Sequence, residues 1–350
     1  MTKQHSTVED QTELMTTSAV ETIQQTVTGS SVTSSMSRGV DFYFQCAVVV
    51  IGVVGTAANA LILYAMVASR QHKKHVLIFN QNALDFASCF FLIVTYAFKL
   101  CNIHLTGRSG YWLCITLMSD NFIWGPTTGS IINLAAITIE RYLKVVHSAW
   151  SKNRLHNWMI YSASAFAWIG GTAASSGVTF STTGVLDGVC YPCLMWDSNT
   201  AYLAYGIWYF LSFEVIILAI FIFCYWRILM VIRRQAHVMA SHEEAGPSTS
   251  QTRQSSKMQS NVIKTMSIVS VFFAVSFTPL NVHLFLVINY ADKLAFAKGT
   301  YYAVLFIAFL YIGSNPFIYA TRFDPVKRVL LGLIPCKKNT VQSVENIAVT

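Results

Sequence analysis

Charged residues are scarce in this sequence. Asp, Glu, Lys and Arg together make up 11% of its 350 residues, whereas hydrophobic residues make up 54%. A soluble domain carries about 25% charged residues, so the composition indicates a chain that is surrounded largely by lipid. The net charge of +8 does not predict binding to nucleic acid, because the basic residues of a membrane protein usually gather on its cytoplasmic face.

Patterns typical of several other classes are also missing. The eight cysteines are spread along the chain, without the spacing of a zinc ribbon or a disulfide-dense scaffold. Residues 1–41 contain no apolar run, so no cleaved signal peptide is expected. A seven-span transporter would need a relay of acids through the bilayer, and an intramembrane enzyme would need a catalytic pair of His, Ser or Asp at matching depth. Neither pattern is visible, so we expect no enzymatic activity and no cofactor.

Seven segments have the length and apolar character of transmembrane helices, which need about 20 residues. The sequence therefore predicts an all-α membrane protein, a seven-transmembrane helix bundle followed by a short amphipathic helix on the membrane surface. The seven segments cover about residues 42–68, 76–100, 111–146, 155–178, 201–232, 262–289 and 299–321.

The polar stretches complete the predicted organisation. We expect a disordered extracellular tail over residues 1–41, a transmembrane domain over 42–322, a surface helix over 323–336 and a cytoplasmic tail over 337–350. Within the domain, residues 233–261 are polar and predict a flexible third inner loop. With the amino terminus outside, 18 of the 24 Lys and Arg residues lie on the inner side. This asymmetry predicts a multi-pass plasma-membrane protein with its carboxyl terminus in the cytoplasm.

An ionisable residue inside a transmembrane helix is costly and therefore marks a functional hypothesis. Asp85 lies in the middle of the second segment, and two interpretations stay open. It is either a carboxylate held by polar neighbours or part of an ion or water site. Asn59, Ser130 and Asn315 lie at similar depth in other segments and would supply oxygen ligands to a small cation.

Two further features interrupt or end the apolar segments. Glu140-Arg141-Tyr142 closes the third segment, where the acid either neutralises the base or both side chains simply reach toward the membrane edge. Pro279 interrupts the sixth segment and Pro316 the seventh. Because proline lacks an N–H and clashes with the preceding turn, both positions predict kinks, and Pro279 predicts a hinge.

Three cysteines lie where the predicted outer face is oxidising. Cys114 begins the third segment at that face, and Cys190 and Cys193 lie in the loop after the fourth segment. Such a compartment permits a disulfide. The sequence leaves open whether Cys114 pairs with Cys190 or with Cys193.

Taken together and in order, these residues resemble the rhodopsin-like G-protein-coupled receptors over about residues 42–336. Each motif alone is weak, but their joint occurrence at matching depth in seven segments is specific. The residues that carry the resemblance are Gly55 and Asn59, Leu84-Asp85, Cys114, Glu140-Arg141-Tyr142, Trp168, Tyr225, Phe273, Phe277, Pro279, Asn315-Pro316 and Tyr319.

The resemblance implies a mechanism without covalent chemistry. Arg141 would be held by Glu140 at rest, and in the active state it would face a heterotrimeric G protein and contact Tyr225. Pro279 would let the inner half of the sixth helix move outward, and Tyr319 would then turn inward. The implied switch residues are Glu140, Arg141, Tyr142, Tyr225, Asn315, Pro316 and Tyr319.

The resemblance also implies partners and modifications. These are arrestin and a receptor kinase, membrane lipid, palmitate on Cys336, and a sodium ion at Asp85 and Ser130. The chain departs from the family pattern at Phe277, where Trp is usual, and at Ile217, where the fifth helix usually has proline. Tyr311 stands where a sodium-binding Asn is common, which argues against the ion.

The ligand is constrained mainly by what the chain lacks. Ile123 stands where amine receptors place an Asp, and Phe309 where opsins place a lysine, so neither a monoamine nor retinal is expected. The loop over residues 179–196 shows partial alternation that predicts a β-hairpin, as in peptide receptors. We therefore favour a neuropeptide or peptide hormone. The alternatives are a small non-amine metabolite and, from another class, a seven-span transporter.

Depth along the segments predicts the residues of the ligand pocket. Glu214 is the most unusual, because it is a carboxylate inside the fifth segment; it would either face a cationic ligand or bond a neighbouring helix. Phe210 and Phe306 are also typical of core packing. The pocket candidates are Asp120, Ile123, Trp124, Thr127, Phe210, Glu214, Phe277, Asn281, His283, Tyr302 and Phe306.

Overall fold

The structure of the chain is a computed structural model. It describes residues 31–101, 103–192, 198–242, 250–290, 298–322 and 324–333. The chain divides into two compact units, Met1–Ala47 and Val48–Thr350. The described part of the first unit is the beginning of helix α2 (Ser31–Ala68).

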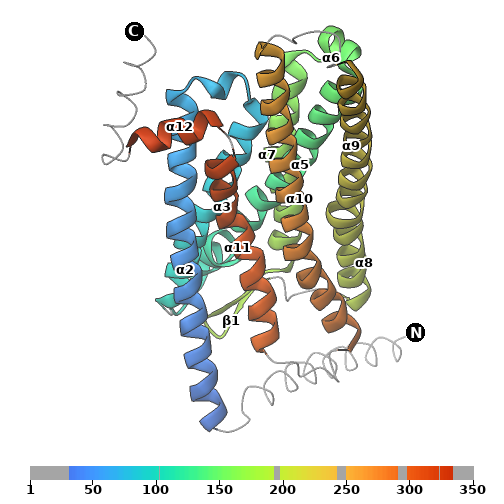
Figure 1. Cartoon of the computed structure of the whole chain (residues 1–350). Helices are drawn as coiled ribbons and strands as arrows, with labels where there is room; N and C mark the ends of the chain where they lie inside the picture. Colours follow the sequence, from blue (N-terminus) through green and yellow to red (C-terminus); the bar gives the residue numbers. More distant parts are fainter. Residues whose placement is uncertain are drawn as a thin grey trace, which may run out of the picture. The chain divides into compact units, whose positions relative to one another are not determined.

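The second unit is a helix bundle with one small β-hairpin. Figure 1 shows α6 and α12 at one end of the bundle and β1 at the opposite end, which we name the α12 end and the hairpin end. After α2, the elements in chain order are η1 (Gln71–Lys73), α3 (Val76–Leu100), α4 (Gly107–Leu113), η2 (Cys114–Met118), α5 (Asn121–Val146), α6 (Ser148–Arg154), α7 (Asn157–Thr182), β1 (Gly184–Leu186), β2 (Val189–Tyr191), α8 (Asn199–Phe210), η3 (Leu211–Val215), α9 (Ile216–His242), α10 (Ser250–Tyr290), α11 (Lys298–Arg322) and α12 (Asp324–Leu333).

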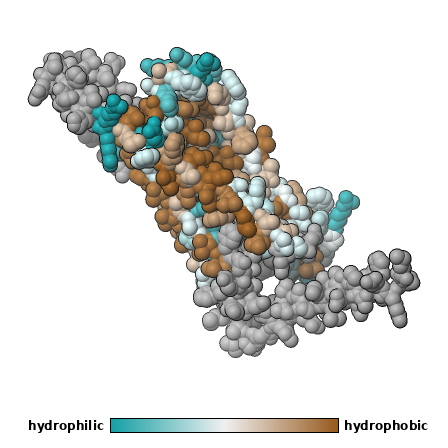
Figure 2. Space-filling model, turned by 90° about the vertical axis from the view of Figure 1, so that its right-hand side faces the viewer, coloured by the Kyte–Doolittle hydropathy of each residue, from teal (hydrophilic) through white to brown (hydrophobic). Residues whose placement is uncertain are grey.

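The outer surface of the bundle is apolar. Figure 2 shows hydrophobic residues over the middle of one face and hydrophilic residues toward its ends. Large aliphatic side chains are widely exposed, among them Ile169 at 70% and Ile222 at 71%. Such a surface is stable in lipid and not in water, which confirms the predicted membrane bundle.

Six helical stretches in the described residues are long and apolar enough to cross a membrane. One more helix of the bundle, α7, is long enough to cross a membrane, because it has 26 residues. It falls outside those six because Ser, Thr and Gly replace aliphatic residues along much of it. Small residues permit close helix packing in membranes, and α7 uses them in this way against α5.

Three glycines bring α5 and α7 into backbone contact. A Cβ atom added at Gly171 would lie 2.3 Å from the Gly129 nitrogen and 2.5 Å from the Gly125 oxygen. A Cβ atom at Gly129 would lie 2.7 Å from the Ala167 oxygen. No real Cβ atom fits at these distances, so this crossing requires glycine at Gly171 and at Gly129.

The third and fifth segments, predicted over 111–146 and 201–232, each contain a π-helical turn. The π-helical turn η2 and Asp120, whose φ of 60° is left-handed, separate α4 from α5. A second π-helical turn, η3, lies between α8 and α9. An inserted residue of this kind breaks the regular hydrogen-bond ladder, and sequence periodicity does not show it.

The described helices also extend into the range predicted as a flexible third inner loop, 233–261. Helix α9 continues to His242 and α10 begins at Ser250. Residues 243–249, between them, lie outside the described part of the chain. Cys193 and Cys336 lie outside it as well.

The predicted hairpin is confirmed. Strands β1 and β2 pair antiparallel, with Val185 opposite Cys190. The two-residue turn is Asp187-Gly188, with φ values of 49° and 77°. Two positive φ values in succession are typical of the type I′ turn, which favours Asp-Gly and matches the twist of the strands.

Candidate functional site

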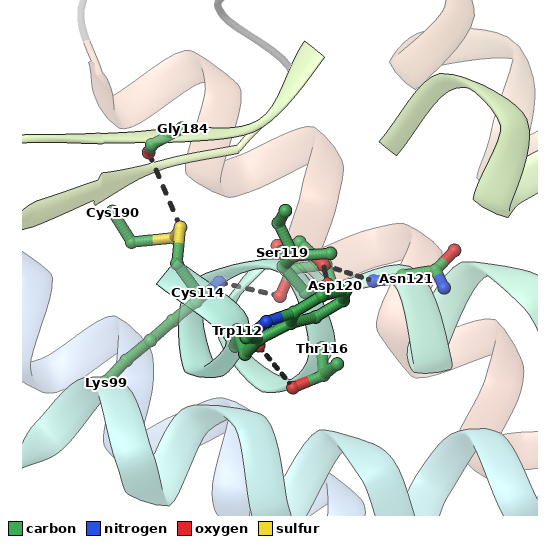
Figure 3. Close-up of a disulfide and its surroundings, with 10 residues drawn as sticks. Lys99, Trp112, Cys114, Thr116, Ser119, Asp120, Asn121, Gly184 and Cys190 are labelled. Atoms are coloured by element: carbon green, nitrogen blue, oxygen red, sulfur yellow. Dashed lines mark hydrogen bonds and ion pairs between the residues drawn. A yellow bond between two sulfur atoms is a disulfide. The ribbon is translucent and has the colours of Figure 1, made fainter. Parts of the chain in front are cut away.

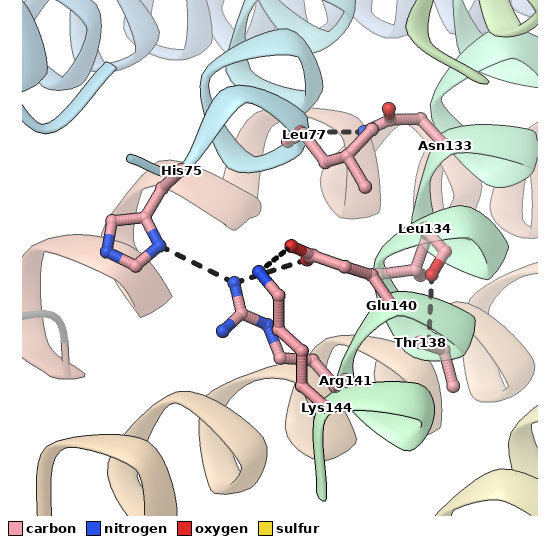
Figure 4. Close-up of polar contacts among 8 residues, drawn as sticks. All are labelled: His75, Leu77, Asn133, Leu134, Thr138, Glu140, Arg141 and Lys144. Carbon is pink, nitrogen blue, oxygen red and sulfur yellow. Dashed lines mark hydrogen bonds and ion pairs between the residues drawn. The ribbon is translucent and has the colours of Figure 1, made fainter. Parts of the chain in front are cut away.

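Arg141 is buried at the α12 end of the bundle. Only 8% of the residue is exposed, and its Nη2 atom lies 3.3 Å from Glu140 Oε2 and 3.5 Å from His75 Nδ1. Lys144 pairs with the other oxygen of Glu140 (Figure 4). The two cations therefore share one carboxylate. Nε of Arg141 has no hydrogen-bond partner among the residues that the structure describes.

His75, which precedes the first residue of α3, must be neutral to pack against Arg141. Burial lowers its pKa from 6.5 to about 4, and the charge of Arg141 acts in the same direction, whereas Glu140 opposes it. Lys144 and Lys74 add smaller lowering effects. At neutral pH the imidazole is therefore an acceptor for the guanidinium.

The stability of the folded state should accordingly decrease as the solution becomes acidic. Between pH 6.5 and about 4 the unfolded chain binds a proton at His75 that the folded chain does not bind, so this group costs up to about 1.4 kcal/mol per pH unit as pH falls. We expect His75→Gln, which stays neutral, to flatten the decline in melting temperature between pH 7 and pH 5. A slope equal to that of the wild type would contradict this assignment.

Two other predicted switch residues, Tyr225 and Tyr319, lie inside the bundle. The Tyr225 hydroxyl lies 3.2 Å from Thr138 Oγ1 and 3.3 Å from Ser270 Oγ. Tyr319 is 1% exposed and its hydroxyl has no hydrogen-bond partner within the described residues. Tyr142 bonds instead to His147, five residues along, at 3.2 Å. These two contacts of the Tyr225 hydroxyl thus join α9 to α5 and α10.

Asp85 is held by hydrogen-bond donors from two other helices. Its Oδ1 accepts from Ser130 Oγ at 2.6 Å, and its Oδ2 accepts from Asn315 Nδ2 at 2.9 Å. Asn59, predicted to join them, donates to Gly55 O at 3.0 Å instead. Its amide nitrogen thus bonds its own helix, whereas its Oδ1 atom is buried without a hydrogen-bond partner among the described residues.

The Asp85 group bonds its neighbours and also keeps unused oxygen lone pairs. Each Asp85 oxygen accepts one hydrogen bond from a protein donor, at 2.6 Å and 2.9 Å, and has a second lone pair. The buried Oδ1 atoms of Asn59 and Asn315 have no hydrogen-bond partner among the described residues. Oxygen lone pairs are what a small cation needs, so these residues fit either interpretation drawn from the sequence, a carboxylate held by polar neighbours or an ion or water site.

This polar group continues across the bundle. Gln81 Oε1 accepts from Asn133 at 2.8 Å, Asn133 Oδ1 accepts from Asn80 at 2.9 Å, and Asn80 Oδ1 accepts from Trp168 at 2.9 Å. Sequence reasoning missed these amides because it searched the spans for ionisable groups. The signal was the run Asn80-Gln81-Asn82 inside an apolar segment.

A cavity of about 260 Å³ opens at the hairpin end. Four predicted pocket residues line it: Asp120, Trp124, Phe277 and Asn281. Its other aromatic residues are Tyr202, Tyr205, Tyr209 and Tyr301, and its hydroxyl residues include Ser119, Thr128, Ser175 and Thr179. Pro192, directly after β2, also lines it.

Several predicted pocket residues do not line this cavity. Ile123 is fully buried, and Thr127 is bonded to Ser88 Oγ at 3.1 Å. Glu214 binds two residues of α10. The remaining predicted residues outside the lining are Phe210, His283, Tyr302 and Phe306. The break at Asp120 turns α5 relative to an uninterrupted helix, so depth counting alone misplaces Ile123 and Thr127.

The tyrosines that line the cavity were not predicted, although their spacing in the sequence indicates a shared helix face. Tyr202, Tyr205 and Tyr209 are spaced by three and four residues, which places them on one face of a helix. The Tyr209 hydroxyl oxygen lies 3.0 Å from Thr128 Oγ1. The cavity wall is thus an aromatic surface with fixed hydroxyl groups.

Asp120, the acidic residue in the cavity lining, forms an ion pair with Lys99. Lys99 Nζ lies 2.6 Å from Asp120 Oδ1 and 4.6 Å from the centre of the Tyr96 ring. Figure 3 shows this ion pair beside the disulfide between Cys114 and Cys190, which fastens η2 to β2. The structure therefore resolves the pairing of Cys114 that the sequence left open.

Removing this disulfide should destabilise the hairpin end. The bond joins residues separated by 76 positions, and a native disulfide typically contributes about 2–4 kcal/mol. We expect Cys190→Ser to lower the melting temperature of the purified protein and to weaken ligand binding. Cys101→Ser, at an exposed free cysteine, is the matched control and should leave both unchanged.

Aromatic rings pack against Phe277, two residues before the predicted hinge at Pro279. Phe277 lies 5.1 Å from Phe273 and 5.4 Å from Tyr311, measured between ring centres. Pro279 lies inside α10 and Pro316 inside α11. The residue that replaces the usual Trp therefore packs between the cavity and the core.

One family model matches the chain. The model described as "7 transmembrane receptor (rhodopsin family)" covers residues 58–319, which includes the cavity, the Asp85 group and Arg141. No curated protein matches the sequence.

Proposed function

We propose, because the chain belongs to the rhodopsin family of seven-transmembrane receptors, that it binds an extracellular ligand at the hairpin end and activates a heterotrimeric G protein at the α12 end. The protein is a multi-pass receptor of the plasma membrane, in a family that is generally not enzymatic. Our proposal adds the orientation, with the amino terminus outside and the carboxyl terminus in the cytoplasm. The 18 basic residues assigned to the inner side support it.

The observation that carries the proposal is the buried Arg141. It is held by Glu140 and His75 while its Nε lacks a partner among the described residues. A guanidinium has five N–H donors, so this one retains capacity for a protein partner once the bundle opens. Opening by outward movement of α10 at Pro279 would release Tyr225 from Ser270 and let it reach Arg141.

The ligand acts by binding the open and closed states with different affinity. We propose a peptide ligand, a neuropeptide or peptide hormone, whose terminal side chains enter the cavity beneath the hairpin. The position of Pro192 in the cavity wall supports this. The aromatic lining suits an apolar or aromatic side chain, and the pairing of Asp120 with Lys99 argues against a monoamine.

A small non-amine metabolite is the second candidate, and the cavity volume favours it. At about 260 Å³ the cavity is slightly below the usual range for small-molecule sites, about 300–1,000 Å³. It would hold a small ligand completely, whereas a peptide would leave most of its length outside.

Further partners follow from the same family. We propose that arrestin and a receptor kinase act on the α12 end, that lipid contacts the apolar surface, and that Cys336 carries palmitate beside the surface helix α12. Cys336 is adjacent to Lys337 and Lys338, which suits attachment near an anionic membrane surface.

Nucleotide exchange by purified G proteins on membranes that contain the protein tests the proposal. A peptide library and a metabolite library applied to the same membranes, with calcium and cAMP read in cells, separate the two ligand classes. Exchange stimulated by a peptide supports the first candidate. If correctly inserted protein stimulates no exchange under any condition, the proposed function is wrong.

A further inference from the structure

Glu214 bonds α10 on both sides of Pro279. Its Oε1 accepts a hydrogen bond from Thr278 Oγ1 at 2.6 Å, and its Oε2 accepts from Asn281 Nδ2 at 3.0 Å. Thr278 immediately precedes Pro279, and Asn281 follows it by two residues. Glu214 itself is only 3% exposed.

A local irregularity of the helix positions the Glu214 carboxylate. Glu214 lies in the π-helical turn η3, within the fifth helix, which lacks the proline usual at Ile217. The extra residue of a π-helical turn shifts the side chains that follow it around the helix axis. Hydrogen bonds to a carboxylate are roughly twice as strong as those between neutral groups, and they are stronger still away from water.

The site of attachment is the weakest point of α10. Pro279 has no N–H, so the carbonyl of Val275 lacks its usual helical partner, and the proline ring opens the preceding turn. If α10 bends there, Thr278 and Asn281 move relative to each other. Glu214 cannot keep both bonds during that motion, because its two oxygens are a fixed distance apart.

The same contacts reach the ligand cavity. Asn281 is part of the cavity lining, together with Phe277 and Leu280. A ligand acceptor that takes the N–H that Asn281 donates to Glu214 therefore competes with that carboxylate. The cavity and the hinge are joined through one side chain.

We propose that Glu214, Thr278 and Asn281 form a clasp that fastens α10 to the fifth helix across Pro279 and holds the receptor in its closed state when no ligand is bound. Glu214 is then a positioning residue, and it contacts neither the G protein nor the bulk of the cavity. The inference rests on the proposed function for its signalling readout only, since helix separation is measurable without a G protein.

The test uses the full-length protein with spin labels on Arg234→Cys and Lys264→Cys, both at exposed positions near the α12 end, after replacement of the reactive exposed cysteines by serine. Thr278→Val removes a hydroxyl while keeping the side-chain shape, and Glu214→Gln removes the charge. We expect each to shift the label distances toward larger values and to raise ligand-free nucleotide exchange at least threefold. Thr278→Ser, which keeps the hydroxyl, should restore both readouts.

Thr182→Val is the matched control. Thr182 also lies inside the bundle, but its hydroxyl bonds only the Val178 carbonyl of its own helix, at 2.8 Å. Unchanged label distances in both Thr278→Val and Glu214→Gln would overturn the clasp, and if Glu214→Gln fails to fold, Thr278→Val decides. Larger distances without any nucleotide exchange would support the clasp and count against the proposed function.

Discussion

Replacing Arg141 with Met is expected to abolish most nucleotide exchange while leaving the receptor folded. Met has a similar length but no donor, so it removes the hydrogen bonds offered to the G protein. A hydrogen bond to a charged group contributes about 1.5–3 kcal/mol, which corresponds to a loss of roughly tenfold to a hundredfold in exchange rate. The measurement is exchange at equal receptor density, without ligand and with any agonist from the peptide screen.

The variant should stay folded for a reason visible in the contacts. Removing one partner of a buried ion pair usually leaves an uncompensated charge, which is strongly destabilising. Here Lys144 also pairs with Glu140, so the carboxylate keeps a cation. Arg154→Met, at an exposed residue of the α12 end, is the control. Exchange in Arg141→Met equal to that in Arg154→Met would remove Arg141 from the mechanism.

The motifs that depend on residue type alone were readable in the sequence. In the structure Glu140 pairs with Arg141, Ser130 and Asn315 lie beside Asp85 as their matching depth predicted, and a hairpin forms within residues 179–196. In each case neighbouring residues, or matching depth in the membrane, restricted the partners. The physics of burying a charge in lipid leaves few alternatives.

Contacts that depend on helix rotation were not readable. The side chain of Glu214 could have faced the cavity or a neighbouring helix, and the π-helical turn η3 decides this. Likewise the left-handed Asp120 ends one helix and begins another, which changes which α5 residues reach the cavity. A one-residue insertion rotates everything after it by about 100°, and composition does not reveal where it occurs.

Among substitutions that add one methyl group to the described bundle, Gly171→Ala is expected to destabilise the protein most. The added carbon would meet backbone atoms of Gly129 and Gly125 rather than the end of a flexible side chain, so only separation of α5 and α7 relieves the clash. Overpacking of this kind typically costs about 1–3 kcal/mol, and we expect the upper end, equivalent to roughly 5–10 °C in melting temperature.

A second glycine of the same helix gives a control in which the melting temperature should not fall. Nothing lies within 4 Å of a Cβ atom placed at Gly177, and Ala is favoured over Gly in a helix by about 1 kcal/mol. Gly177→Ala should therefore leave the melting temperature unchanged or raise it. The pair separates helix propensity from packing, because both changes add the same methyl group to α7.

The consequence of separating the two helices extends to the polar core. Trp168 of α7 donates to Asn80, which in turn donates to Asn133 of α5, so a wider gap lengthens bonds that lead through Gln81 to Asp85. Gly171→Ala should thus disturb the Asp85 group as well as the crossing itself. If Gly171→Ala and Gly177→Ala melt at the same temperature, α5 and α7 do not pack through their backbones, and the small residues of α7 need another explanation.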